Sequence, residues 1–553
     1  MQHPNEHLES YRQSAGELEN HIIDEFKAGR LSRRELMMRG TIAGMSIPML
    51  GLLADGAYAA PRGVAAPKAG GTLRIAVSKS ATSFEPPDLA EQAEIVTALI
   101  PGEQLCFADS KSKLIPILAE SWAPSNGGKT WTFKLRQGVK FHDGTVMTSA
   151  DVVASFERLI PTAFAGVLAA GGVTAPDANT VQFNLLAANG LFPYQTAQSV
   201  YQSVILKKDY QKGDWVGKGM IGTGPYKLAP GGFTPDVGAK FVKNTDWWGL
   251  KAGLTNPLDG VELQYLDANA KVLALKGGQV DVVDQVSYLE SKSLGGGFTS
   301  IPIRTPTHRQ MHMNTTSPLF KDKRVREAIA LCLNRPGNVK TLWGDKGEIG
   351  NDHPFWAGYV FSNNTLPQKK QNYAKAKALL AAAGKSNLSI TLSYYQNLEM
   401  PQYAQLVQQQ VKGAGIKCKL KSYTGKQYFA GANQDARKKG ASPWLSVDMG
   451  IVDWGARAVP TIYLTRALSH FAGDWNPSRF NNKTYDNLVK AFLASADLQT
   501  QKANATKIEK LLIDETPAIY SYFYNFIAAT NGKPQNYIPD GLGVINLRGV
   551  SLG

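Results

Sequence analysis

The segment KFHDGTVMTSADVVASFERL, residues 140–159, decides how the fold of this chain is interpreted. Its His142 stands directly before Asp143, and a histidine beside a carboxylate can relay protons or bind a metal ion. The pair Asp143-Gly144 is also a typical turn, and it follows an apolar alternation that ends at Phe141. The segment therefore has two possible interpretations. It is either part of a catalytic site, or a strand, a turn and a helix without a catalytic role.

The second half of the segment predicts a helix that carries its own start signal. Thr148 offers a hydroxyl to the first free amides, and Asp151 stands three residues on, where a capping box has Glu or Gln. Apolar residues then recur at helical spacing from Val152 to Leu159. Because every residue of the segment has a structural role, we expect no catalytic role for His142.

The totals describe a folded protein with more than one domain. The 553 residues exceed one ordinary core, and 43% hydrophobic with 19% charged residues is typical of globular chains. The net charge is +15, but Lys and Arg are dispersed without a basic run, so no nucleic acid is expected as a partner. The odd number of cysteines (Cys106, Cys332 and Cys418) and their wide spacing imply no disulfide framework.

Residues 30–59 are typical of an export signal. Arg33-Arg34 precede an apolar segment from about Thr41 to Ala54, which is shorter than the ~20 residues of a spanning helix. A small-x-small cleavage motif, AYA, ends the region. The signal resembles the twin-arginine type, although the two residues after the arginines depart from its commonest form. No cysteine follows the apolar segment, so we expect a soluble periplasmic protein and not a lipoprotein.

After a linker at residues 60–70, strands and helices alternate along the chain. Alternating apolar residues predict strands at 130–135 and 180–186. Helical periodicity predicts three helices, at 322–333, 374–383 and 401–413. Strands follow the second and third of these helices, and this order is typical of an α/β fold with a covered sheet.

The sequence does not match the common catalytic and metal-binding motifs, and the mismatches can be assigned to particular residues. Residues 126–130, NGGKT, end like a phosphate-binding loop, but Ala123 occupies the place of the first glycine and a strand follows. The mature chain contains no HExxH and no GxSxG motif. His308 and His312 flank Gln310 on one face of a strand, but they lack a third ligand. We therefore expect no enzyme activity, no cofactor and no metal site.

The stretch ILAESWAPSNGGKTWTFKLRQGVKFHDGTVMTSADVVASFERL, residues 117–159, closely resembles the signature region of family 5 extracytoplasmic solute-binding proteins. These proteins are the peptide- and nickel-type receptors of ABC importers. Further motifs of the family follow in order: GTGPY at 222–226, GGQVDVV at 277–283, residues 314–335, VDWGARAVPTIYL, and FNNKTYDNLVKAF. The resemblance covers about residues 70–553.

The resemblance implies a two-lobed α/β periplasmic-binding-protein fold of type II, which closes on its ligand like a hinged clamp. The implied parts are lobe I at 71–305 with a subdomain inserted at about 107–219, lobe II at 306–523, and a C-terminal return to lobe I at 524–553. The chain would cross the hinge twice, near Arg304 and near Tyr522.

The function implied is that of the periplasmic substrate-binding component of an ABC importer. We expect a monomer that captures a peptide or a similar amine-bearing organic solute and delivers it to permease subunits in the inner membrane. The alternatives are a nickel or metal-chelate receptor or a sugar receptor on the same scaffold, and a secreted hydrolase or chaperone.

The resemblance also indicates ligand-binding residues. Asp453, in GIVDWGARAVP, stands where peptide-binding members have the Asp that pairs with the ligand amino group, and a buried carboxylate needs a cationic partner. Trp454 beside it would stack on the ligand or pack. The remaining candidates are Phe84, Glu85, Asp284, Gln285, Tyr394, Tyr395 and His312.

Two of these positions depart from the family. Glu85 replaces the Asp that is usual in the first cleft loop. Some dipeptide receptors carry an Arg after the first long strand of lobe II, which clamps the ligand carboxylate, whereas this chain has Tyr394-Tyr395-Gln396 there. The departure argues against a short peptide with a free carboxylate. The aromatic side chains suit a sugar, a modified peptide or an amine-bearing organic ligand.

Overall fold

The computed structural model of the chain describes residues 12, 15–27, 36, 69–79, 83–89, 92–109, 113–430, 442–470, 475–495, 498–540 and 544–553. The chain forms two compact units, Met1–Lys68 and Ala69–Gly553. The described part of the first unit is mainly helix α2, Glu17–Lys27. The twin-arginine pair, the apolar segment and the cleavage motif of the predicted export signal lie outside the described residues.

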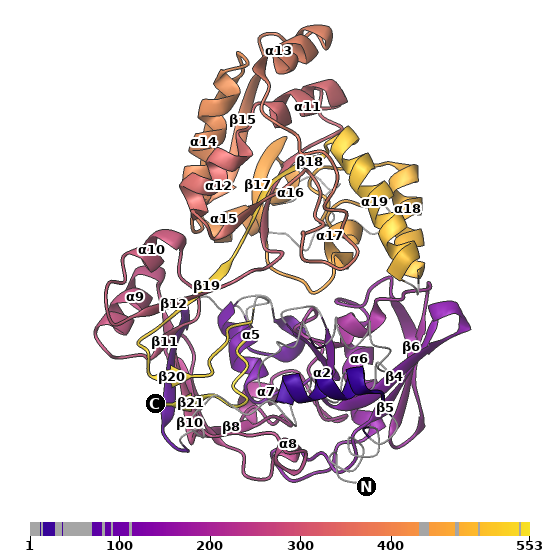
Figure 1. Cartoon of the computed structure of the whole chain (residues 1–553), viewed down its shortest axis with the longest axis vertical. Helices are drawn as coiled ribbons and strands as arrows, with labels where there is room; N and C mark the ends of the chain where they lie inside the picture. The colour runs from indigo at the N-terminus through magenta and orange to yellow at the C-terminus, as the bar shows by residue number, and fades with distance from the viewer. Residues whose placement is uncertain are drawn as a thin grey trace. The chain divides into compact units, whose positions relative to one another are not determined.

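A seven-stranded sheet forms the first lobe of the second unit (Figure 1), in the order β12-β19-β11-β1-β10-β9-β8. Its central strand β1 runs parallel to both neighbours, and Leu73, Ile75 and Val77 of that strand are fully buried. The strands are β1 Thr72–Ser78, β8 Tyr226–Thr234, β9 Gly238–Lys243, β10 Gly260–Leu266, β11 Val282–Val283, β12 Thr299–Ile303 and β19 Phe526–Thr530.

Short helices and two small strand pairs complete this lobe. The helices are η1 Pro86–Asp88, α5 Gln92–Leu99, α7 Asp214–Gly217, α8 Trp248–Lys251, α9 Ala268–Lys276 and α10 Tyr288–Lys292. The strand pairs are β2 Cys106–Ala108 with β3 Leu114–Pro116, and β20 Pro534–Gln535 with β21 Ser551–Leu552.

A separate four-stranded sheet, β4-β5-β7-β6, contains the surroundings of the 140–159 segment. Its elements are β4 Ala119–Ser125, η2 Asn126–Gly128, β5 Thr130–Leu135, β6 Leu168–Asp177, β7 Thr180–Leu185 and η3 Phe192–Thr196. The helix predicted in the segment is α6, Ser149–Leu159, and it begins as expected. The Asp151 carboxylate accepts hydrogen bonds from the Thr148 backbone N–H at 2.8 Å and from the Thr148 hydroxyl at 3.0 Å.

His142 holds the turn of this segment against the backbone of a distant loop. Its Nδ1 accepts a hydrogen bond from the Gly222 N–H at 3.3 Å, and its Nε2 lies 3.0 Å from the Gly224 carbonyl oxygen. Asp143 instead bonds the Thr145 backbone N–H and pairs with Lys207. The histidine and the carboxylate therefore have separate partners, as a structural turn requires.

A six-stranded sheet forms the second lobe, in the order β14-β18-β13-β17-β15-β16. Its strands are β13 His308–Met313, β14 Gly347–Ile349, β15 Ser389–Tyr395, β16 Lys417–Tyr423, β17 Met449–Trp454 and β18 Ala518–Tyr524. Its helices are α11 Lys323–Leu331, α12 Arg335–Trp343, α13 Tyr373–Ala382, α14 Met400–Lys412, α15 Gly425–Phe429, α16 Pro443–Ser446, α17 Thr461–Thr465, α18 Lys483–Ala494 and α19 Leu498–Glu515. The three helices predicted from periodicity correspond to α11, α13 and α14.

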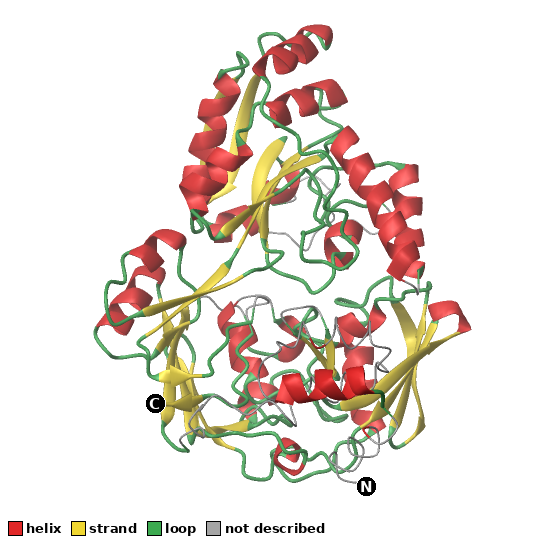
Figure 2. Cartoon of the chain, viewed as in Figure 1, coloured by secondary structure: helices red, strands yellow, loops and turns green. Residues whose placement is uncertain are grey.

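Two neighbouring strands carry the chain from one lobe to the other (Figure 2). β12 pairs with β19 in the first sheet, and their continuations β13 and β18 pair in the second. Between the sheets, the Thr305 hydroxyl donates to the Tyr524 carbonyl oxygen at 2.9 Å, and the Tyr524 N–H donates to the Thr307 carbonyl oxygen at 3.0 Å. The chain thus crosses twice, as the resemblance implied, while the predicted domain boundaries themselves stay predictions.

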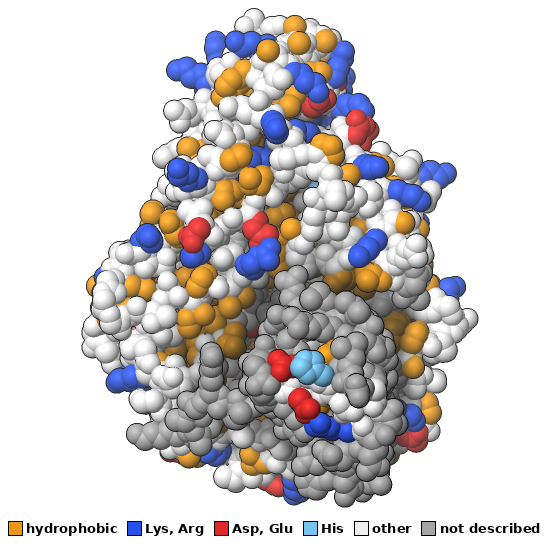
Figure 3. All heavy atoms as spheres, in the orientation of Figure 1, with side chains coloured by type: hydrophobic (Ala, Val, Ile, Leu, Met, Phe, Trp, Pro, Cys, Tyr) orange, Lys and Arg blue, Asp and Glu red, His pale blue; other side chains and the backbone are white. Residues whose placement is uncertain are grey.

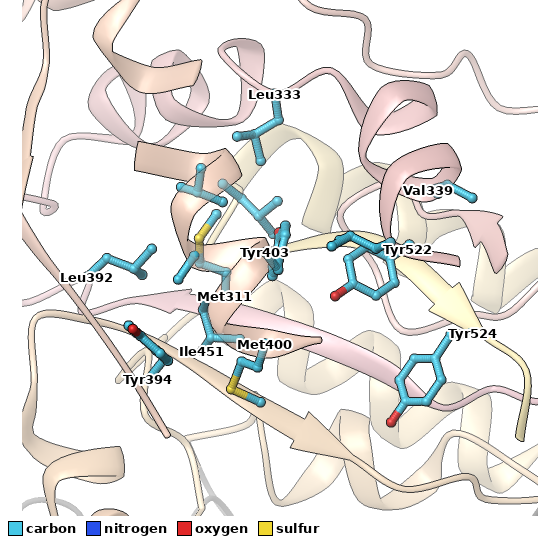
Figure 4. Close-up of a cluster of buried hydrophobic side chains, with 14 of the residues drawn as sticks. Met311, Leu333, Val339, Leu392, Tyr394, Met400, Tyr403, Ile451, Tyr522 and Tyr524 are labelled. Atoms are coloured by element: carbon cyan, nitrogen blue, oxygen red, sulfur yellow. The ribbon is translucent and has the colours of Figure 1, made fainter. Parts of the chain in front are cut away.

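The largest buried cluster lies around β13, β17 and β18 (Figure 4). It includes Met311, Ile451 and Tyr522, together with Met400 and Tyr403 of α14. On the face in Figure 3, Lys and Arg side chains are scattered and do not form one patch, which agrees with the dispersed basic residues of the sequence. Within the described ranges, no helix is long and apolar enough to cross a membrane.

Candidate ligand-binding site

The candidate site is built around the end of β17, which lies between β13 and β15 in the sheet. The antiparallel register of β13 and β17 places Arg309 opposite Asp453 and His308 opposite Trp454. Successive side chains of a strand point to opposite faces of the sheet. Asp453 and Trp454, adjacent in sequence, therefore belong to different surroundings.

Arg309 is the centre of a charged cluster on one of these faces. Its side chain is 0% exposed, and its Nε and Nη2 donate to the two carboxylate oxygens of Glu399 at 2.9 and 2.8 Å. Its Nη1 donates to the Tyr524 hydroxyl at 2.9 Å and forms an ion pair with Asp453. Burial lowers the pKa of Arg309, but the charges of Asp453 and Glu399 outweigh this effect and hold the pKa well above its usual value.

Asp453 is the accessible member of the cluster, because its side chain is 23% exposed. Its Oδ1 accepts from the Tyr524 hydroxyl at 2.9 Å and faces Arg309. Its Oδ2 accepts no hydrogen bond from the residues that the structure describes. Two carboxylates share one guanidinium in this cluster, so it carries a formal excess of one negative charge.

The loop after β17 contains a second charged group, Arg457, which sequence reasoning did not single out. The Tyr463 hydroxyl donates to the Gly455 carbonyl oxygen at 2.6 Å, and the Tyr359 hydroxyl donates to the Arg457 carbonyl oxygen at 2.7 Å. The Arg457 guanidinium donates to the hydroxyl of Tyr201 and lies 4.8 Å from the centre of its ring. Tyr201 packs against the core of the first lobe, so the two lobes meet at this loop.

The aromatic residues predicted to contact the ligand are partly committed to packing. Trp454 is buried, and its Nε1 donates to the Gln310 amide oxygen at 2.9 Å. Tyr394 is buried in the large core cluster of the second lobe (Figure 4). Tyr395 is half-buried and stacks on Tyr428 with ring centres 5.4 Å apart.

The predicted residues of the first cleft loop pack into the first lobe. Phe84 is half-buried and contacts the edge of Phe233, with ring centres 4.8 Å apart. Glu85 is buried, and it accepts hydrogen bonds from the Tyr210 hydroxyl and from the Val216 N–H, the latter at 3.2 Å. The Glu at this position is therefore tied to its own lobe.

Asp284 and Gln285 lie beside a buried lysine. Lys271 Nζ pairs with Asp284 Oδ1 at 2.8 Å, and both side chains are buried. The same ammonium donates to the Ser78 hydroxyl at 2.8 Å and to the Gln285 carbonyl oxygen at 2.9 Å. Asp284 is thus neutralised within the protein, whereas the Gln285 side chain is half-buried.

The two histidines of β13 are enclosed by the second lobe. The His308 Nδ1 lies 2.8 Å from the Pro306 carbonyl oxygen, and burial lowers the pKa of His308 and of His312 to about 3. His312 has no hydrogen-bond partner among the described residues. No cluster of three or more His, Cys, Asp or Glu side chains suited to a metal occurs in the described part of the chain.

Sequence reasoning missed Arg309 and Glu399 as well as Arg457. Arg309 lies between two histidines on a strand whose residues are all buried, and a charge in such a strand requires a partner. That requirement was visible in the sequence. The identity of the partner was not, because Glu399 lies 90 residues further along the chain.

Comparison with protein families gives one match over most of the chain. Residues 113–475 match the model described as bacterial extracellular solute-binding proteins, family 5 middle. The glutathione-binding protein GsiB of Pectobacterium atrosepticum is 26% identical over 491 residues, which cover 85% of this chain and 92% of the relative.

Two solved structures have the same fold. The periplasmic binding protein DppA from Helicobacter pylori, in complex with the peptide STSA, gives a TM-score of 0.74 at 21% identity and covers 88% of this chain and 98% of its own. The oligopeptide-binding protein AppA from Bacillus subtilis, in complex with a nonapeptide, gives 0.71 at 22% identity and covers 88% and 100%. At these identities the likeness supports the fold and leaves the ligand open.

Proposed function

Because the chain belongs to the bacterial extracellular solute-binding proteins of family 5, we propose that it captures a peptide or a similar amine-bearing organic solute for an ABC importer. This family consists of binding proteins rather than enzymes. Capture would take place between the two lobes, and the loaded protein would deliver its ligand to permease subunits from the periplasmic side.

The negative excess of the Arg309 cluster carries this proposal. Asp453 and Glu399 share one guanidinium, and one oxygen of Asp453 accepts no hydrogen bond from the described residues. Burial of a charged group away from water costs several kcal/mol unless a group of opposite charge is bound beside it. An ammonium group of the ligand at Asp453 Oδ2 would neutralise the cluster when the lobes enclose it.

The arrangement of the lobes supports capture by closure. The lobes are joined through two crossings near Thr305 and Tyr524. They also touch through non-covalent contacts, which include Arg457 with Tyr201 and the Gly190 N–H with the Leu493 carbonyl oxygen. Contacts of this kind can separate and form again without unfolding either lobe. Such motion would admit the ligand and then exclude water from it.

The relatives agree with an amine-bearing ligand. GsiB is named as a glutathione-binding protein, and DppA was solved with a peptide. Both ligands carry an ammonium group, which is the chemistry that the Asp453 cluster would accept. The other predicted ligand residues remain proposals: Phe84, Gln285 and Tyr395 are half-buried, whereas Trp454, Glu85, Asp284, Tyr394 and His312 are buried.

Native mass spectrometry of protein purified from its own periplasm, followed by calorimetric titration, tests the proposal. The bound molecule should carry a primary amine, and free-amine peptides should bind at least about tenfold more tightly than their N-acetylated forms. Equal binding of the two forms would contradict the role of Asp453. Tight saturable binding of nickel or of a sugar, with no peptide bound, would replace the proposal with one of those receptors.

A further inference from the structure

The guanidinium of Arg457 has N–H donors that its contacts with the described residues leave without an acceptor. Its Nη1 donates to the Tyr201 hydroxyl and, at 2.8 Å, to the Ala456 carbonyl oxygen. Its Nε is buried and has no hydrogen-bond partner in the part of the chain that the structure describes. Among the described residues no carboxylate lies within ion-pair distance of Arg457, and its Nη2 makes no hydrogen bond to them.

The unused pair of donors is the pair that binds carboxylates elsewhere in this chain. Among the described residues, four other arginines present Nε and Nη2 together to a carboxylate: Arg74 to Asp281, Arg304 to Glu348, Arg309 to Glu399, and Arg324 to Asp322. The two parallel N–H groups match the two oxygens of a carboxylate, and such bidentate pairs are among the stronger hydrogen-bonded contacts in proteins. Arg457 offers the same pair of donors, and no acidic side chain of the described residues binds it.

The surroundings of Arg457 hold this pair of donors in place. Tyr359 and Tyr463 fix the backbone of the loop through their hydroxyls, and the Tyr201 ring lies against the guanidinium. Burial raises the pKa of Tyr463, Arg457 opposes this rise and Asp453 adds to it. Both charges therefore act on the same hydroxyl, at the end of β17 that faces the first lobe.

We propose that Arg457 binds a carboxylate of the ligand through Nε and Nη2. The proposal rests on the proposed function and narrows it: the ligand is a zwitterion, with its ammonium at Asp453 and its carboxylate at Arg457. The sequence argued against a free carboxylate because no Arg follows the strand that ends at Tyr395. Arg457 supplies the missing cation from the loop after β17.

A different role for the same contact is a latch between the lobes, in which Arg457 serves only to hold Tyr201. The two roles separate in their response to substitution. A latch is weakened equally by Arg457→Gln and by Tyr201→Phe, which keeps the ring and removes the hydroxyl. If Arg457 binds the ligand carboxylate, the protein loses its preference for ligands with a free carboxylate only when the guanidinium itself is removed.

The test is calorimetric titration of the full-length mature protein with pairs of ligands that differ only in their carboxylates. The pairs are tri-alanine with tri-alanine amide, and glutathione with its diethyl ester. The wild type should bind the free acid of a pair about 30-fold or more tightly than its neutral partner, as for a buried charge pair that loses one member. Arg457→Gln should reduce this ratio to near one, and Arg457→Lys should restore part of it.

Two controls complete the experiment. Tyr201→Phe should retain the acid preference, and so should Arg324→Gln, which changes an exposed arginine that pairs with Asp322. Thermal melting checks that each variant is folded, and Arg457→Lys, which keeps the charge, serves if Arg457→Gln does not fold. Equal binding of acid and amide by the wild type, or loss of the preference in Tyr201→Phe, would overturn the role of Arg457. Failure of every peptide to bind would instead refute the proposed function, and the present inference with it.

Discussion

Arg309 and Asp453 lie opposite each other on the antiparallel strands β13 and β17 and form an ion pair. The pair changes how Asp453 acts, because the carboxylate is held by the protein before any ligand arrives. Glu399 satisfies the other side of the same guanidinium and leaves the cluster one negative charge in excess. Asp453 is therefore held in place by Arg309, within a cluster that has one negative charge in excess.

Replacement of Asp453 by Asn should weaken the binding of amine-bearing ligands by about 10- to 100-fold. The side chain keeps its shape, and Arg309 keeps Glu399, so the fold should be retained. Titration calorimetry with tri-alanine measures the loss. Asp345→Asn is a matched control, since Asp345 is exposed and pairs with Lys346 at the surface. Unchanged affinity in Asp453→Asn would remove this residue from the site.

Replacement of Glu399 by Gln should lower the free energy of unfolding by about 1.5–3 kcal/mol, because the buried Arg309 loses its charge-assisted hydrogen bonds to Glu399 while it keeps its ion pair with Asp453. Urea unfolding at neutral pH measures the change. The control is Glu327→Gln, which breaks the more exposed pair with Lys375 and should cost less than about 1 kcal/mol. A similar small loss in both variants would show that Asp453 alone can neutralise Arg309.

The buried histidines should make the protein less stable as the pH falls. Burial lowers the pKa of His312 to about 3 in the folded state, whereas an unfolded chain has a value of about 6.5. As the pH falls, the unfolded state therefore binds the proton first. Below pH ~6.5 the free energy of unfolding decreases by about 1.4 kcal/mol per pH unit for each such histidine, until the pH reaches about 3. Replacement of His312 by Leu should reduce the loss between pH 7 and pH 5 by about 2 kcal/mol.

Urea unfolding at the two pH values checks this expectation. His470→Gln is the control, because His470 is exposed. The same pH dependence in wild type and His312→Leu would mean that His312 is protonated equally in both states.

His142→Ala should bind ligand like the wild type and lose stability. The ring bonds the backbone of Gly222 and Gly224, and loss of a buried hydrogen-bonding partner costs about 1–3 kcal/mol. Thermal unfolding measures the stability, and titration with tri-alanine measures the affinity. A large loss of affinity in a variant that remains folded would assign this residue to the ligand site after all.

Much of the fold follows from local patterns. The alternation at 130–135 became β5, the helix predicted after Thr148 became α6, and the helix predicted at 401–413 became α14, Met400–Lys412. These predictions succeed because strand and helix periodicity, turn residues and caps act within a few residues of each other.

The candidate site was predicted only in part. The resemblance pointed to Asp453, whose role stays a prediction, but it pointed neither to its partner Arg309 nor to Arg457. Glu85 and Asp284 were expected to face a ligand, and the structure pairs them with Tyr210 and with Lys271. The two members of such a pair are separated along the chain, so a local sequence pattern does not predict that they will be in contact.

The sequence by itself determined the family, the order of strands and helices, and the structural nature of the His142–Asp143 turn. Only the tertiary structure decided the charges of the site. The register of β13 against β17 sets Arg309 on Asp453, and the meeting of the lobes sets Arg457 on Tyr201. The physical reason is that the net charge of a buried site depends on which side chains folding brings within a few ångströms, and distance along the chain does not reveal this.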